Sequence, residues 1–223
     1  MKRRAFGALG LTVLAVVLTG CGGRSGEGIA TPNITEPAPA SSAKVYLPEG
    51  NHLSKSPNSK VTIVEFTDYQ SSACKDAAVR LEELTKKYAG RINVQVRNFP
   101  VVEINPKSRI AAQAAEAVRM TDSNAYPAYS KILYSTQSEW SPLDWQAATD
   151  KFAEYAKQVH IDEKTFRDAV NSQKVKSAVE RDENDAKSLQ LPGTPALYLN
   201  GSRVSSGLSP AALNDEIDSL LSK

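Results

Sequence analysis

The sequence predicts an α/β domain whose sheet-bearing core is interrupted by an all-helical insertion. Residues 61–66 and 92–98 have the composition of two strands with a helical pattern between them. From residue 107 to about residue 190 every strong hydrophobic period is helical, and strand signals return only at residues 195–199. The expected order is therefore strand, helix, strand, a long helical block, a hairpin and a closing helix. Order alone leaves several α/β folds open.

A secretion signal precedes this domain. Residues 2–4 are basic, residues 5–18 are apolar, and the tetrapeptide at residues 18–21 (LTGC) resembles the bacterial lipobox. A transmembrane anchor is the alternative, but the apolar stretch is shorter than the roughly 20 residues that cross a bilayer as a helix. We therefore expect a lipoprotein signal peptide at residues 1–20, a lipid on Cys21, and attachment to the extracytoplasmic face of the cell membrane.

The chain after the signal peptide has almost no net charge. Loss of the leader removes three basic residues, which leaves 24 Lys and Arg against 25 Asp and Glu. Such a balance gives no electrostatic footprint for nucleic acid. Residues 22–43 hold too few large apolar side chains to offset the entropy cost of ordering. We expect a lipidated flexible tether over residues 21–43 and one domain over residues 44–223.

Local patterns predict the first elements of that domain. Residues 61–66 form a β-branched run of buried-strand length, residues 71–88 repeat apolar positions at helical spacing, and residues 92–98 alternate apolar and polar side chains. The helical insertion is expected over about residues 105–190. Three residues with capping side chains mark helix starts near or within its second half: Ser141, Asp162 and Ser172.

The C-terminal part returns to strand signals. Residues 195–199 form a short apolar run, and Asn200-Gly201 is a hairpin turn that leads into Arg203-Val204. Ser209-Pro210 then caps and opens a last helix over residues 211–221.

Four segments, in order, resemble the DsbA-like family of disulfide oxidoreductases. Residues 65–75 (EFTDYQSSACK) look like the segment in which a strand ends in an acidic and aromatic stretch and a Cys-x-x-Cys pair opens a helix. The others are residues 97–100 (RNFP), 108–117 (SRIAAQAAEA) and 193–201 (GTPALYLNG). Because they span residue 61 to the C-terminus, the resemblance implies a thioredoxin-like fold with a helical insertion, related to thiol-disulfide oxidoreductases.

The first segment departs from the family at its most important position. Ser71 stands where the first cysteine should be, and only the second cysteine remains, as Cys74. In the family the first thiol is stabilised as a thiolate at the helix start and attacks, and the second resolves the mixed disulfide. A serine hydroxyl cannot exchange with a disulfide. The resemblance therefore implies a degenerate catalytic pair, Ser71 and Cys74, whose dithiol activity is lost or altered.

Spacing indicates which way Cys74 points. It begins an apolar stripe at i, i+3 and i+4 positions that continues through Ala77, Ala78, Leu81, Leu84 and Tyr88. We expect a buried thiol, and burial in apolar surroundings raises a thiol's pKa. This favours a structural core cysteine over a reactive one.

Ser71 has two interpretations that sequence does not separate. Serine at a helix start commonly accepts a backbone N–H as an N-cap. Its hydroxyl could also orient the sulfur of a bound small thiol, an arrangement similar to that of the kappa-class glutathione transferases. Both roles can coexist.

The resemblance also assigns residues around this pair. Thr194 and Pro195 look like the cis-proline segment that binds substrate polypeptide, with an ordinary trans proline as the alternative. We expect Glu65 to be a partly buried acid with a hydrogen-bond partner and Asp68 to be a solvated loop acid. His52 and His160 lack ligand spacing, so the sequence predicts no metal site and no cofactor.

Aromatic residues are concentrated in the insertion. We expect most of them in its core and a minority along a groove at the active-site end: Tyr126, Tyr129, Tyr134, Trp140, Trp145, Phe152 and Tyr155.

The sequence leaves three functions open for this envelope lipoprotein. The first is thiol-disulfide chemistry altered to a single thiol at Cys74. The second is a non-catalytic module that binds envelope polypeptides or a partner through Pro195 and the insertion. The third is a small-thiol transferase that uses Ser71. Family descent favours the first and the missing nucleophile favours the second.

Overall fold

The computed structural model describes residues 45–223. The signal peptide, Cys21 and the tether therefore lie outside the described residues, and their assignment stays a prediction. The described chain has a five-stranded sheet in the order β1-β3-β2-β4-β5, in which only β2 and β3 are parallel. The strands are β1 (Asn51–Ser54), β2 (Val61–Thr67), β3 (Ile92–Asn98), β4 (Ala196–Leu199) and β5 (Ser202–Arg203).

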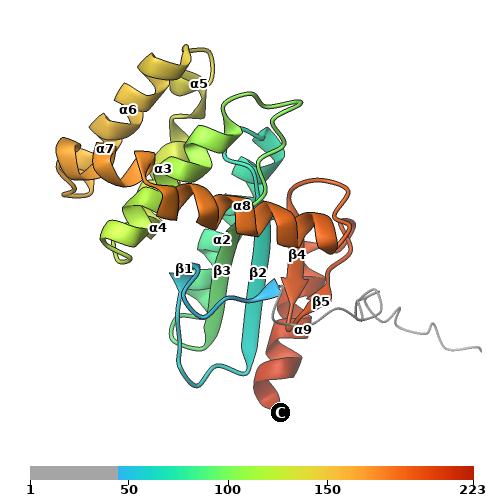
Figure 1. Cartoon of the computed structure of the whole chain (residues 1–223). Coiled ribbons are helices and arrows are strands. Elements are labelled where there is room, and N and C mark those ends of the chain that lie inside the picture. The colour runs from blue at the N-terminus through green and yellow to red at the C-terminus, as the bar shows by residue number, and fades with distance from the viewer. Residues whose placement is uncertain (1–44) are drawn as a thin grey trace, which may run out of the picture. The chain divides into compact units, whose positions relative to one another are not determined.

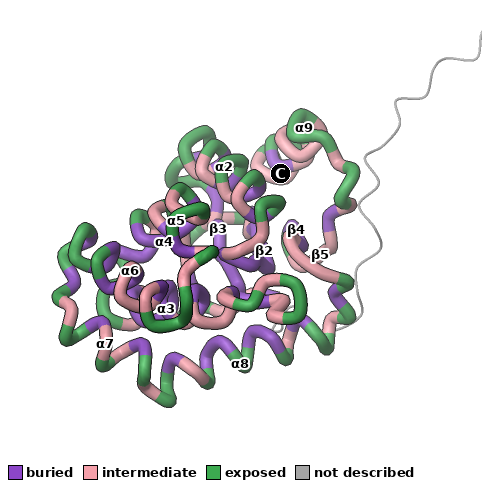
Figure 2. The backbone as a smooth tube through the Cα atoms, turned by 90° about the horizontal axis from the view of Figure 1, so that it is seen from above, coloured by how far each residue is buried: buried purple, intermediate pink, exposed green. Residues whose placement is uncertain are grey.

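Helices cover both faces of the sheet. Helix α2 (Ser72–Lys87) and helix α9 (Pro210–Ser222) lie on one face, and α8 (Gln173–Ser188) crosses the other (Figures 1 and 2). The side chains of β2 alternate accordingly. Val61 and Ile63 belong to the core under α2, whereas Val64 and Phe66 pack with residues of α8 and β4. Glu65 thus belongs to the row that faces α2 and α9.

The predicted helical block lies between β3 and β4. It comprises α3 (Ser108–Thr121), α4 (Tyr126–Ser135), α5 (Gln137–Trp140), α6 (Trp145–Gln158), α7 (Glu163–Asn171) and α8. The predicted caps are confirmed at Asp162, which accepts from the Thr165 N–H, and at Ser172, which accepts from the Val175 N–H.

The helix start predicted at Ser141 is wrong. Ser141 instead has helical dihedrals as the C-cap residue of α5, and the next helix begins at Trp145. The cap there is Asp144, whose carboxylate accepts from the Ala147 N–H at 2.8 Å. Pro142 disfavours a helical backbone at the residue before it, yet Ser141 is helical here, and the extended residue that a cap requires is Asp144.

The insertion has an aromatic core of its own. Six of the seven expected aromatic side chains are buried, and Trp140 is fully enclosed against Phe152 with its indole N–H bound to the Leu133 carbonyl. The exception is Trp145, which is 54% exposed at the start of α6. Figure 2 shows the buried residues of the insertion on the inner sides of its helices.

Strand β1 was missed in the sequence. Its residues, Asn51 to Ser54, are mostly polar and only four in number, and they pair antiparallel with β3 through an irregular register. Such a short edge strand has no hydrophobic alternation to reveal it. Its position depends on the partner strand rather than on its own sequence.

The C-terminal hairpin and helix follow the prediction closely. Asn200 and Gly201 both have positive φ, which the tight turn between β4 and β5 requires. Ser209 caps α9 by accepting from the Ala212 N–H, and Pro210 occupies its first turn.

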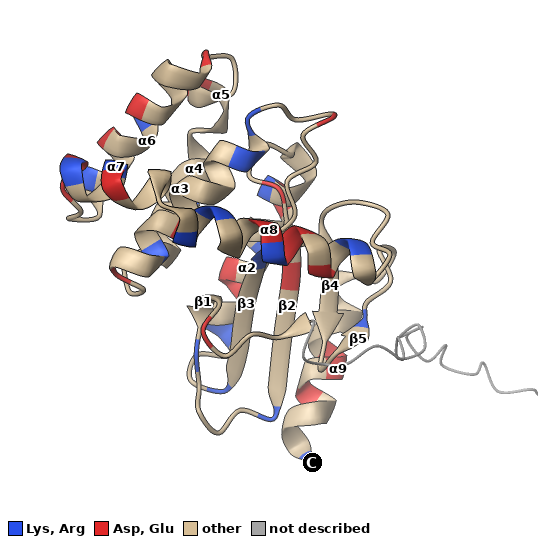
Figure 3. Cartoon of the chain, viewed as in Figure 1, with Lys and Arg blue, Asp and Glu red and all other residues tan. Residues whose placement is uncertain are grey.

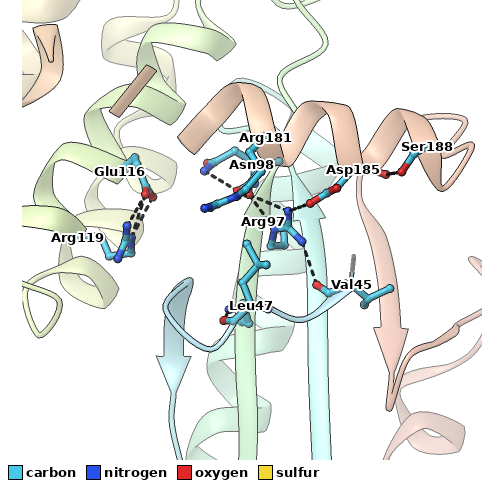
Figure 4. A network of polar contacts seen from close by, with 11 residues as sticks. Val45, Leu47, Arg97, Asn98, Glu116, Arg119, Arg181, Asp185 and Ser188 are labelled. Atoms are coloured by element: carbon cyan, nitrogen blue, oxygen red, sulfur yellow. Dashed lines mark hydrogen bonds and ion pairs between the residues drawn. The ribbon is translucent and has the colours of Figure 1, made fainter. Parts of the chain in front are cut away.

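A buried polar network fixes α8 to the sheet (Figure 4). The Arg97 guanidinium on β3 contacts Asp182 at 2.8–2.9 Å and Asp185 at 2.7 Å, and it also donates to the Val45 carbonyl. The second oxygen of Asp182 accepts from the Asn98 backbone N–H. The Arg97-Asn98 segment therefore has a structural role here, because removing one partner would leave a buried charge uncompensated.

The surface helices carry charges of both signs. In the view of Figure 3, Lys and Arg alternate with Asp and Glu along α6, α7 and α8. Over residues 45–223, no helix combines the length and the apolar character that crossing a membrane requires.

Candidate functional site

The candidate site lies where β2 gives way to α2. Ser71 has an extended backbone and is the N-cap of α2. Its Oγ accepts a hydrogen bond from the Cys74 backbone N–H, with 3.4 Å between the oxygen and the nitrogen. The predicted cap is therefore confirmed. The insertion holds this turn in place, because the Gln137 amide of α5 donates to the carbonyls of Tyr69 and Ser71. The Ser71 hydroxyl thus has a partner within its own helix.

Cys74 is enclosed at the start of α2. Its side chain has no exposed surface, and Sγ accepts from the Asp68 backbone N–H at 3.4 Å. Burial raises the pKa of the thiol, and a hydrogen bond from the Thr194 side chain offsets part of that rise. The predicted burial is confirmed. Burial and the raised pKa both disfavour the thiolate form of Cys74 in the folded protein.

The Thr194-Pro195 bond is cis, as predicted. It directly precedes β4, and the contact between Thr194 and Cys74 places this segment beside the start of α2. The four residues 192–195 are exposed or half-buried. Within residues 45–223, the backbone groups of Gly193 and Thr194 make no hydrogen bond to other backbone. The backbone N–H and carbonyl groups of this segment are therefore left without backbone partners next to the buried Cys74 thiol.

Glu65 is more deeply buried than predicted, at 2% exposure. Its Oε1 accepts from the Thr67 hydroxyl at 2.7 Å, and the Tyr134 hydroxyl lies 2.7 Å from the same Thr67 oxygen. Since Thr67 donates its one proton to Glu65, Tyr134 is the donor to Thr67. Burial raises the pKa of Glu65 to about 7, with the Thr67 hydrogen bond acting in the opposite direction. The other oxygen, Oε2, is buried with no partner among the described residues.

Asp68 is not the solvated loop acid that the sequence predicted. It is 1% exposed, and its Oδ2 accepts from the Val101 N–H and the Asn105 side-chain amide, with the Ser108 hydroxyl at 2.8 Å. Its Oδ1 accepts from the Gln70 N–H. These donors come mostly from a segment 33–40 residues further along the chain, which no local pattern reveals. Asp68 fixes the loop before α2 against the start of the insertion.

A contact between two buried tyrosines beside this loop was also not predicted from the sequence. Tyr69 and Tyr126 are fully buried, and their hydroxyls lie 2.9 Å apart. Tyr69 also packs against the Tyr134 ring with 4.9 Å between the centroids. Aromatic composition indicated a core but not which hydroxyls would meet. Among residues 45–223, no three His, Cys, Asp or Glu side chains form a cluster suited to a metal ion.

Comparison with solved structures shows the fold. The thiol-disulfide exchange protein alpha-DsbA2 from Wolbachia pipientis superposes with a TM-score of 0.68 over 80% of this chain and 90% of that chain, at 23% identity. At this level of sequence identity, the superposition shows that the two proteins share a fold. It agrees with the predicted DsbA-like arrangement of sheet, insertion and closing helix.

Comparison with characterised sequences gives two kinds of relative. The chain is 29% identical over 149 residues to the probable disulfide bond formation protein D of Bacillus cereus, which covers 63% of this chain and 66% of that protein. It is 26% identical over 156 residues to the Na(+)/H(+) antiporter NhaA 3 of Salinispora tropica, across 70% of this chain and 22% of that protein. The chain thus spans less than a third of the antiporter's length.

A family model decides the assignment. The model described as Thioredoxin matches residues 49–219, which includes the whole candidate site and the insertion. This chain therefore belongs to the thioredoxin family, in the DsbA-like form that carries an all-helical insertion in a thioredoxin-like fold.

Proposed function

We propose that this protein is a lipid-anchored, DsbA-like domain of the cell envelope that has lost dithiol exchange and binds polypeptide at its Pro195 segment. The observation that carries the proposal is the state of Cys74. Its thiol is unexposed, hydrogen-bonded through Sγ and raised in pKa, and Ser71 takes the place of the attacking cysteine. Dithiol exchange needs two cysteines and this site has one, whereas the Thr194-Pro195 segment that would hold a substrate has the cis bond expected of it.

The Pro195 segment supports binding of an extended chain. Its backbone at Gly193 and Thr194 is free of internal backbone hydrogen bonds and lies at the entry to β4. An extended polypeptide can add main-chain hydrogen bonds to such a segment, much as a strand adds to a sheet edge. No thiol is needed for this interaction, so Cys74 should not contribute to it.

The experiment measures binding of an extended, cysteine-free peptide to the purified protein by fluorescence anisotropy. Gly193 offers a matched pair of variants, because a Cβ at this position meets no atom within 4 Å. Gly193→Ala should bind like wild type, and Gly193→Gln, which places a longer side chain over the backbone, should bind about tenfold more weakly. Cys74→Ala should bind as wild type does. Equal binding by Gly193→Gln and wild type, or dependence on Cys74, would contradict the proposed site.

The membrane part of the proposal rests on the lipobox at residues 18–21. Wild-type protein should fractionate with membranes and incorporate labelled fatty acid such as palmitate, and Cys21→Ala should abolish the label. Cys74→Ala is the matched control, because it removes the other cysteine and should leave the label in place. Lipid on the Cys21→Ala variant would show that the attachment site is elsewhere.

Small-thiol transfer is a second candidate, and one observation favours it. Ser71 is half-buried rather than enclosed, so a thiol could approach its hydroxyl while the hydroxyl caps α2. The titration of wild type and Ser71→Ala with glutathione tests this candidate. Heat of binding that depends on Ser71 would support transfer, and no heat with glutathione would exclude that thiol as the substrate.

A further inference from the structure

The turn between β4 and β5 carries an asparagine whose side chain is bound to the start of β2. The Oδ1 of Asn200 accepts from the Thr62 backbone N–H at 2.8 Å, and its Nδ2 donates to the Lys60 carbonyl at 3.0 Å. The Asn200 backbone N–H also donates to the Thr62 carbonyl at 2.8 Å. Figure 1 shows β4 beside β2, which brings the turn to residues that lie 138 and 140 positions away in the chain. The Asn200 side chain therefore fastens the turn to the neighbouring strand.

The residue that follows Asn200 makes this side chain chemically vulnerable. In an Asn-Gly pair, the glycine nitrogen can attack Cγ of the asparagine side chain. A C–N bond forms, the side-chain nitrogen leaves as ammonia with the proton of the glycine nitrogen, and a succinimide ring remains. Water then opens the ring to aspartate or isoaspartate, without any oxidant, reductant or enzyme. Glycine favours the attack because it has no Cβ to hinder its nitrogen.

The fold guards this pair through the amide rather than through the attacking nitrogen. The Gly201 N–H has no hydrogen-bond partner among residues 45–223, and Asn200 is exposed to solvent. The two side-chain hydrogen bonds fix Cγ of Asn200 against β2, so closing the ring onto Gly201 would break both of them. Because breaking them costs free energy, the reaction in the folded protein is limited to the fraction of time in which the turn is open.

The products of the reaction cannot rebuild the same contacts. An aspartate at position 200 keeps an acceptor for the Thr62 N–H but has no N–H to donate to the Lys60 carbonyl. Isoaspartate also adds one backbone atom to a two-residue turn that is closed by the pairing of Leu199 with Ser202. Either product therefore weakens the attachment of the turn to β2.

We propose that Asn200-Gly201 is a one-way modification site. The pair stays intact while the turn is fastened to β2 and deamidates when the turn separates from that strand, after which the turn cannot be fastened as before. The site lies at the opposite end of β4 from Pro195. It depends neither on thiol chemistry nor on polypeptide binding.

Ageing of the purified full-length protein at constant pH and temperature tests the guard, with mass spectrometry of its proteolytic peptides to locate the deamidated residue. The reference is a synthetic peptide of residues 198–204 in the same buffer, which has the same Asn-Gly pair without β2. We expect Asn200 to deamidate more slowly in the folded protein than in the peptide, by roughly tenfold or more. Equal rates in the protein and the peptide would overturn the proposal, whichever variants fold.

Two valine truncations test whether opening of the turn controls the rate. Val204→Ala removes buried packing directly after β5 and should speed deamidation of Asn200 several-fold. Val79→Ala is the matched control, because it makes the same change at an exposed position on α2 and should leave the rate unchanged. A Val204→Ala protein that deamidates at the wild-type rate would contradict control by opening.

Asn200→Asp reproduces one product of the reaction. It should lower the midpoint of thermal unfolding, because the donor to the Lys60 carbonyl is lost. Asn58→Asp is the matched control, since Asn58 is exposed and its side chain has no hydrogen bond to another described residue. It should keep the wild-type midpoint. An Asn200→Asp protein as stable as wild type would contradict the claim that the modification is one-way.

Discussion

The two ends of helix α2 differ in how much of their polar chemistry is already satisfied. At its N-terminus, Ser71 caps the helix, Cys74 accepts the Asp68 N–H, and no part of the thiol is exposed. Further along, the same helix borders an apolar cavity that Glu65 lines from β2, and the buried Oε2 of Glu65 has no partner among the described residues. The segment that resembles a catalytic motif is thus the closed one. The cavity lies further along the helix, and Thr194 and Pro195 of the cis-proline segment also line it.

Glu65 and Asp68, three residues apart, show the same contrast in one side-chain type. Asp68 is surrounded by donors from its own loop and from the start of the insertion. Glu65 receives one hydrogen bond and has a pKa of about 7 because it is buried. A carboxylate that folding fully satisfies has a structural role, whereas one that folding leaves half-satisfied is available for proton uptake.

The largest expected effect would come from placing a second thiol at the N-terminus of α2. Ser71→Cys restores a Cys-x-x-Cys pair at a helix N-terminus, where the new thiol is half-exposed and its thiolate is stabilised by free N–H groups. We expect a disulfide between residues 71 and 74 and a two-electron couple in glutathione redox titrations, where wild type shows none.

Ser72→Cys, at an exposed neighbouring position, is the matched control and should not form that couple. If Ser71→Cys stayed fully reduced under oxidising glutathione, the closed end would differ from its family in more than one side chain.

The next effect concerns the half-satisfied acid. The folded-state pKa of Glu65 is raised from 4.5 to about 7. Below pH 4.5 this carboxyl is protonated in both the folded and the unfolded protein and costs no stability. As the pH rises from 4.5 towards 7, the unfolded protein loses the proton more readily, so the free energy of unfolding falls. We expect the free energy of unfolding to fall by roughly 3 kcal/mol between pH 4.5 and pH 8 through this group. Denaturant titrations across that range should show the slope in wild type and lose it in Glu65→Gln.

Glu83→Gln is the control, because Glu83 is an exposed acid at the rim of the same cavity. It should keep the wild-type slope. A Glu65→Gln variant with the same pH dependence as wild type would mean that Glu65 is not the group that titrates.

The smallest effect concerns the cap. Ser71→Ala should lower the free energy of unfolding by about 1 kcal/mol, because the first turn of α2 loses the acceptor of the Cys74 N–H. Peptide binding at Gly193 should be nearly unchanged. Ser71→Asp, which keeps a capping oxygen, should restore most of the stability. A fall in the free energy of unfolding well above the roughly 1 kcal/mol of an N-cap would indicate that Ser71 also supports the fold in another way.

Sequence patterns located the elements whose signals are local. The β-branched run of β2, the caps at Ser71, Asp162 and Ser172, and the Asn200-Gly201 turn each depend on a few adjacent residues. The burial of Cys74 followed from helical spacing in the same way. The resemblance to the DsbA-like family supplied the cis bond at Pro195, which periodicity does not reveal.

Features that depend on distant partners could not be read in this way. Strand β1 is defined by its pairing with β3, and Asp68 is buried by donors more than 30 residues away. The free oxygen of Glu65 and the cavity beside it require the positions of α2, β4 and α9 together. The motifs at residues 65–75 and 193–201 therefore indicate the start of α2 and the segment beside it, whereas the cavity follows only from the packed structure.

The rate at which an alkylating reagent modifies Cys74, measured against pH and against denaturant, tests the central claim most directly. The account requires that Cys74 of the folded protein stay unmodified at neutral pH, and that its reaction appear only as the protein unfolds, with the same midpoint as the loss of structure. Fast modification of the folded protein, with an apparent pKa below the usual value of about 8.5 for a thiol, would show that Cys74 is a working nucleophile and would contradict the account.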